Sequence, residues 1–101
     1  MKQYTTPDQT AKLIELGWPK PKSIIDYKKT YYDRVAEVWI DFTYAYSIGE
    51  LIEMLDGVSE LEITRFGSGW GVYDELRAFT GEELIDALYD MIVKLKEEGV
   101  I

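Results

Sequence analysis

The segment from Thr80 to Ile101 constrains the fold most strongly, because its periodicity fits only one kind of element. Apolar residues recur along it at helical spacing: Leu84, Leu88, Met91, Ile92 and Leu95. Thr80 and Glu83 have the spacing of a capping box, in which each side chain accepts a hydrogen bond from the other residue's backbone N–H. The pattern predicts a helix over about 81–98. Such a helix needs another surface against which its apolar side is buried.

Two shorter helices are indicated by their starting residues. Thr6-Pro7-Asp8-Gln9 offers a threonine cap, a proline at the first helical position and a glutamine three residues after the cap. Ser47 and Glu50 repeat the capping-box spacing and precede an apolar face. These signals predict helices over about 7–16 and 48–56.

A hairpin over about 59–79 is predicted directly before the last helix. Leu61 and Ile63 alternate with polar residues, and a second apolar run starts at Trp70. Gly67-Ser68-Gly69, between the two runs, tolerates the positive φ of a tight turn. The second strand either continues to Phe79 or breaks near Asp74 and restarts.

A further strand is predicted over 36–43, where Val38, Ile40 and Phe42 alternate with Trp39, Asp41 and Thr43. The whole chain, 1–101, then reads as one α+β domain. We expect two layers, with an antiparallel sheet of two to four strands packed by three helices.

The missing residue types bear on function. The chain has no cysteine and no histidine, and histidine is both the usual general base near neutral pH and the commonest metal ligand. We therefore expect a protein that is not an enzyme, with no catalytic residues, no metal and no cofactor. No apolar run approaches the roughly 20 residues of a membrane helix, and the polar first residues resemble no signal peptide. A cytoplasmic location with no membrane partner is expected.

Charge is distributed unevenly. Residues 1–34 hold seven basic and four acidic side chains, whereas residues 35–101 hold four basic and fifteen acidic ones. The net charge of −8 disfavours nucleic acid as a partner, because attraction to phosphates dominates non-specific binding.

Three stretches resemble a known group of proteins: TAKLIELGWPKPKS, AYSIGELIEML and ELIDALYDMIVKLKEEGVI. The group consists of small uncharacterised proteins of gut-bacterial genomes, phages and mobile elements. Its layout has an LxELG helix, a YSIGEL-type capped helix, a variable middle and an ELIDALYDMI helix, and residues 24–44 depart from it. The resemblance implies no activity and transfers no functional residue. A mobile-element setting favours an interaction protein over a metabolic enzyme.

Three motifs could be mistaken for chemical sites. The GSGWG run of residues 67–71 lies between two strand patterns and lacks the lysine and following helix of a phosphate-binding loop, so a hairpin turn is favoured. Glu82, Asp86 and Asp90 share one helix side and could ligate a hard cation, but a solvated row is favoured because no compact oxygen cage is evident. Asp74-Glu75 is interpreted as a turn and not as a general acid–base pair.

The segment WPKPKSIIDYKKTYYDR interleaves basic with aromatic residues, as binding surfaces often do. The candidate interaction surface comprises Trp18, Lys20, Lys22, Lys28, Lys29, Tyr31, Tyr32 and Arg34. The alternative is a loop whose aromatic residues anchor it to the core.

The leading hypothesis for function is therefore a non-catalytic protein that binds a protein partner or associates with itself. A second hypothesis is an acidic decoy, encoded by a mobile element, that imitates DNA. A small cation-dependent enzyme is the third.

Overall fold

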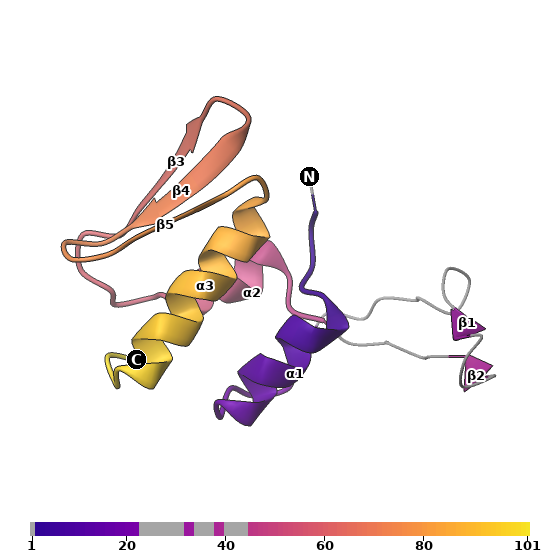
Figure 1. Ribbon diagram of the computed structural model, residues 1–101. Helices are drawn as coiled ribbons and strands as arrows, with labels where there is room; N and C mark the ends of the chain where they lie inside the picture. The colour runs from indigo at the N-terminus through magenta and orange to yellow at the C-terminus, as the bar shows by residue number, and fades with distance from the viewer. Residues whose placement is uncertain (1, 23–31, 34–37, 40–44) are drawn as a thin grey trace.

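The computed structural model describes residues 2–22, 32–33, 38–39 and 45–101 (Figure 1). Its helices are α1 (Pro7–Glu15), α2 (Ile48–Met54) and α3 (Leu84–Glu97). Its strands are β1 (Tyr32–Asp33), β2 (Val38–Trp39), β3 (Glu62–Phe66), β4 (Gly69–Tyr73) and β5 (Ala78–Gly81). The predicted α+β class, with three helices and a small antiparallel sheet, is confirmed.

The main sheet is an antiparallel meander in the order β3-β4-β5. Residues 67 and 68 form the tight turn between β3 and β4, and Gly67 has a φ of 53°, which glycine adopts without strain. Gly69 already belongs to β4, where it is opposite Phe66. The predicted hairpin is confirmed, and its second half breaks after Tyr73, so β5 is a separate strand.

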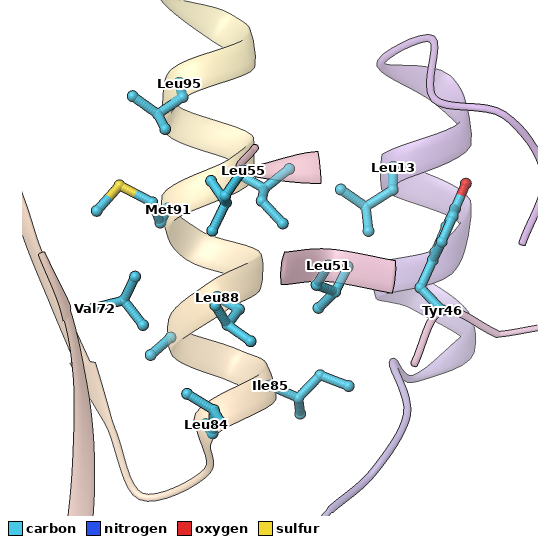
Figure 2. Close-up of a cluster of buried hydrophobic side chains, with 12 residues drawn as sticks. Leu13, Tyr46, Leu51, Leu55, Val72, Leu84, Ile85, Leu88, Met91 and Leu95 are labelled. Atoms are coloured by element: carbon cyan, nitrogen blue, oxygen red, sulfur yellow. The ribbon is translucent and has the colours of Figure 1, made fainter. Parts of the chain in front are cut away.

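The core lies around α3, which packs on β4 and β5 on one side and on α2 on another (Figures 1 and 2). Seven α3 residues are buried: Leu84, Ile85, Ala87, Leu88, Met91, Ile92 and Leu95. Val72 of β4 closes the cluster on the sheet side, and Leu13 of α1 and Leu51 of α2 lie on the far side of α3 (Figure 2). Burial from several directions makes this helix the centre of the fold.

The start of the last helix differs from the sequence prediction. Helix α3 begins at Leu84 and not near residue 81, and its cap residue Glu83 makes no side-chain capping bond. Thr80 is the third residue of β5 and is opposite Gly71, so it cannot cap the helix. The carboxylate of Glu83 instead accepts a hydrogen bond of 2.7 Å from the backbone N–H of Lys2. Pairing within the sheet has overridden a local capping pattern.

The other two helix starts agree with the prediction. Thr6 and Gln9 form a complete capping box at α1, with Pro7 in the first turn. Ser47 and Glu50 form the same motif at α2. The two caps therefore determine where these helices begin.

A chain of buried hydroxyl groups joins the N-terminal segment to the start of α2. The Tyr46 backbone N–H donates to Thr5 Oγ1 at 3.0 Å, and Thr5 Oγ1 lies 2.7 Å from Thr10 Oγ1. Thr10 Oγ1 donates to the Thr6 carbonyl oxygen at 2.8 Å, so the Thr5 hydroxyl is left to donate to Thr10. The Tyr46 hydroxyl donates to the carbonyl oxygen of Pro19, which connects the residue before the α2 cap to the segment after α1.

Strands β1 and β2 form a separate antiparallel ladder, in which Tyr32 is opposite Trp39 and Asp33 is opposite Val38. It lies away from the helices and the main sheet (Figure 1). The strand predicted over 36–43 is found at Val38–Trp39, and its other residues lie outside the described part of the chain. No helix in the described residues is long and apolar enough to span a membrane.

Candidate functional site

One hollow among the described residues is a groove at the end of the molecule where α3 ends. Three segments line it: the end of α2 with the loop that follows, the turn between β4 and β5, and the C-terminal residues. Its lining residues are Met54, Asp56, Gly57, Val58, Ser59, Asp74, Glu75, Leu76, Arg77, Val100 and Ile101. The volume of about 450 Å³ lies within the usual range of ligand sites, about 300–1,000 Å³. We call this hollow the groove.

Two aliphatic side chains of the groove face solvent. Leu76 is 83% exposed and Val100 is 52% exposed. Leu76 is more exposed than any other large hydrophobic residue in the described ranges. A single exposed leucine needs no explanation, but here a second exposed aliphatic residue borders the same hollow. Because so exposed a side chain contributes little to folding, Leu76 is a candidate contact residue for a partner.

The turn that carries Leu76 is held by a buried carboxylate. Asp74 Oδ1 accepts hydrogen bonds from the backbone N–H groups of Leu76, at 2.8 Å, and Arg77, at 2.6 Å. Asp74 Oδ2 pairs with Arg77 Nη1 at 2.9 Å, and only 7% of the Asp74 side chain is exposed. Burial by itself would raise the pKa of Asp74, but these hydrogen bonds and the Arg77 charge outweigh burial and hold that pKa below its usual range. The prediction of a turn at Asp74 is confirmed.

Arg77 extends this network to the end of α3. Its guanidinium pairs with Glu98 through Nη2 and donates from Nε to the same Glu98 oxygen at 3.0 Å. Hydrogen bonding to Arg77 lowers the pKa of Glu98, and hydrogen bonds to Glu98 and Asp74 raise the pKa of Arg77. The network fixes the turn against α3, so Leu76 is presented from a well-defined backbone position.

The groove has an acidic rim. Asp56 and Glu75 are exposed, and neither forms an ion pair within the described ranges. Arg77 is the only basic side chain in the lining, and two carboxylates already share its charge. An apolar surface beside uncompensated carboxylates favours a ligand that is both apolar and positively charged.

The interaction surface predicted from sequence is only partly within the described residues. Lys20 and Lys22 are exposed and line a second hollow of about 230 Å³ with Trp18. Trp18 is half-buried, packs against the core and lies under Lys96, whose Nζ is 4.8 Å from the centroid of the Trp18 ring. That interaction gives Trp18 a structural role.

The structure does not place the other residues of the predicted interaction surface beside Trp18, Lys20 and Lys22. Tyr32 belongs to β1, and the ladder of β1 and β2 lies apart from α1 and α2 (Figure 1). Lys28, Lys29, Tyr31 and Arg34 lie outside the described residues. The structure thus places Trp18, Lys20 and Lys22 together at one hollow, and the surface as a whole stays a prediction.

The acidic row predicted on the last helix is not one row: Asp86 and Asp90 lie on α3, but Glu82 precedes the helix, which begins only at Leu84. Glu82 and Asp90 are exposed, as predicted. Asp86 differs, because Lys2 Nζ and Gln9 Nε2 each donate to its Oδ1 at 2.8 Å. Burial would raise the pKa of Asp86, and these two hydrogen bonds outweigh it and lower that pKa. Among residues with described positions, no group of three or more acidic side chains could hold a metal ion.

Sequence reasoning did not single out Leu76 and Val100, the two exposed aliphatic residues of the groove. One local signal for Leu76 was present, because it lies between the charged residues Glu75 and Arg77 in a segment already interpreted as a turn. The chain matches no protein-family model, and neither the comparison with curated proteins nor that with solved structures finds a similar protein.

Proposed function

We propose that this chain is a cytoplasmic binding protein that acts by holding another protein chain and performs no chemistry of its own. One observation carries the proposal: Leu76 is 83% exposed beside the groove, on a turn held by the buried Asp74 carboxylate. A role in phages or mobile elements, as the sequence resemblance implies, is in keeping with an interaction protein.

The exposed side chain of Leu76 is presented by a turn that hydrogen bonds to Asp74 hold in place. Folding accounts for buried apolar groups, but it gives no reason to hold a leucine in solvent with a network of ion pairs behind it. A partner side chain that covers Leu76 and Val100 would remove apolar surface from water, which contributes about 25 cal/mol per Å². The turn is already ordered, so little conformational entropy would be lost there on binding.

The experiment is affinity capture with three versions of the chain, each immobilised at equal density. Leu76→Ser removes the exposed leucine, and Ile14→Ser is the matched control, because Ile14 is a partly exposed aliphatic residue on α1 outside the groove lining. We expect one protein species to be retained by the original chain and by Ile14→Ser, and lost with Leu76→Ser. Equal retention by all three versions would refute the role of Leu76.

The same experiment tests the other hypotheses. An acidic decoy would retain a DNA-binding protein, and that retention would depend on exposed carboxylates and not on Leu76. A cation-dependent enzyme would need a group of acidic ligands, and the described residues contain no group of three or more that could hold a metal ion. If no version retains any protein, including further copies of the chain itself, the binding function is wrong.

A further inference from the structure

Four charged side chains beside the groove neutralise one another. Arg77 Nη1 lies 2.9 Å from Asp74 Oδ2, and the same guanidinium pairs with one oxygen of Glu98. The other oxygen of Glu98 lies 3.4 Å from Lys94 Nζ. Two cations and two carboxylates therefore leave this cluster without net charge at neutral pH.

The acidic rim of the groove, Asp56 and Glu75, stands outside this cluster. Both side chains are exposed and line the groove, and neither forms an ion pair within the described ranges. The whole lining also belongs to residues 35–101, which carry eleven net negative charges. The rim charge is therefore not compensated locally, and the surrounding chain reinforces its attraction for cations.

Five apolar side chains form another part of the lining. Leu76 and Val100 are exposed, whereas Met54, Val58 and Ile101 are partly buried and pack against the core cluster. The three inner side chains are thus held by the fold, and the two outer ones are left in water. A partner that contributes aliphatic side chains of its own would remove this surface from water.

We infer that the groove binds a short segment of another protein in which large aliphatic side chains stand next to lysine or arginine. This inference rests on the proposed binding function and specifies the chemistry of the partner. The aliphatic side chains of the segment cover Leu76 and Val100, and its cations lie near Asp56 and Glu75. An acidic segment is repelled by the rim, and a basic segment without apolar side chains leaves Leu76 in water.

The first experiment measures the binding of three dye-labelled peptides to the full chain by fluorescence anisotropy. One peptide has a Lys-Leu-Leu-Lys centre between glycine and serine residues. The second has glutamate in place of lysine, and the third has serine in place of leucine. We expect the first peptide to bind at least about tenfold more tightly than either counterpart, because it alone matches both the apolar lining and the rim. Equal binding of the lysine and glutamate peptides, or no binding of any peptide at millimolar concentration, would overturn the inference.

Substitutions at the rim test the charge preference. Asp56→Asn with Glu75→Gln should weaken binding of the lysine peptide by about fivefold. Glu15→Gln with Glu82→Gln is the matched control, because it removes two exposed carboxylates outside the groove lining and changes the net charge equally. An equal effect of the two pairs would show that the rim has no special role and would contradict the inference.

Reversal of the rim charge gives a stronger test. In Asp56→Lys with Glu75→Lys, the glutamate peptide should bind more tightly than the lysine peptide, because complementarity returns with opposite sign. Far-ultraviolet circular dichroism checks that the variant is folded, and the neutral pair above decides the question if it is not. A folded variant that still prefers the lysine peptide would overturn the inference.

The last comparison separates this inference from the broader binding function. Leu76→Ser should weaken binding of the lysine peptide by about tenfold, and Ile14→Ser, outside the groove, should leave it unchanged. If a protein is captured through Leu76 while the lysine and glutamate peptides bind equally, the binding function stands and the charge preference is wrong. If the chain binds no peptide but associates with itself through Leu76, a second copy occupies the groove and the inference is overturned.

Discussion

The hydroxyl chain Tyr46–Thr5–Thr10–Thr6 is predicted to contribute cooperatively to stability. Thr5 is 0% exposed, and its hydroxyl accepts from the Tyr46 N–H while it donates to Thr10. Thr5→Val keeps the shape but leaves a buried N–H without a partner, which costs about 1–3 kcal/mol. The additional buried methyl group returns up to about 0.8 kcal/mol, so we expect a net loss of about 1–2 kcal/mol.

A double-mutant cycle separates the hydroxyl chain from general packing. Thr10→Val leaves the Thr5 hydroxyl without its acceptor, whereas the Thr6 carbonyl keeps its hydrogen bond of 2.9 Å from the Thr10 backbone N–H. Either single substitution removes the hydrogen bond between the Thr5 and Thr10 hydroxyl groups, so the second substitution cannot remove it again. The loss of unfolding free energy in the double variant should therefore be about 1 kcal/mol smaller than the sum of the two single losses.

The assay for this cycle is urea denaturation followed by tryptophan fluorescence, with the thermal midpoint as a second measure. A loss of 1 kcal/mol should lower the midpoint by roughly 4–8 °C for a domain of this size. Thr80→Val is the matched control, since Thr80 is an exposed strand residue, and it should change stability by no more than about 0.5 kcal/mol. Additive losses at the two buried threonines would refute the cooperative hydroxyl chain.

Two further predictions concern the groove turn and the glycines. The pKa of Asp74 is lowered in the folded chain, so the Asp74 carboxylate stabilises the fold above the unfolded pKa of about 4, and this stabilisation is lost as pH falls through the folded pKa. The difference in unfolding free energy between the original chain and Asp74→Asn should therefore shrink in denaturation curves from pH 7 to acid. A constant difference would contradict this. Gly49→Ala should raise stability by about 0.5 kcal/mol, because the nearest atom to the new methyl group is Ser47 Oγ at 3.8 Å. Gly71→Ala should lower stability by at least about 1 kcal/mol, because its new methyl group meets the Tyr73 ring. Thermal midpoints that shift in the same direction for both variants would count against these packing assignments.

The elements with strong local signals could be predicted from sequence. The apolar residues of α3, from Leu84 to Leu95, are buried as their spacing predicts, and Thr6 and Ser47 cap their helices. Thr80 was assigned wrongly, because its pairing with Gly71 depends on a strand distant in sequence. A capping pattern describes only a few neighbouring residues, so it cannot show that the same residue is needed by a sheet.

The groove could not be predicted because it is assembled from three separated segments. Leu76 and Leu88 are the same residue type, and only the folded structure distinguishes the 83% exposed side chain from the buried one. The role of Asp74 in holding the turn likewise depends on Arg77 and on Glu98, which lies 21 residues further along the chain. The basic, aromatic segment was visible in the sequence because its residues are contiguous.

The most direct test of the binding function is photo-crosslinking from position 76 inside cells that express the chain. A photoreactive phenylalanine derivative replaces Leu76 in one version and Ile14, outside the groove, in a control version. We expect a defined adduct with another protein chain from position 76 and none from position 14. The absence of an adduct at position 76, or the same adducts from both positions, would contradict it.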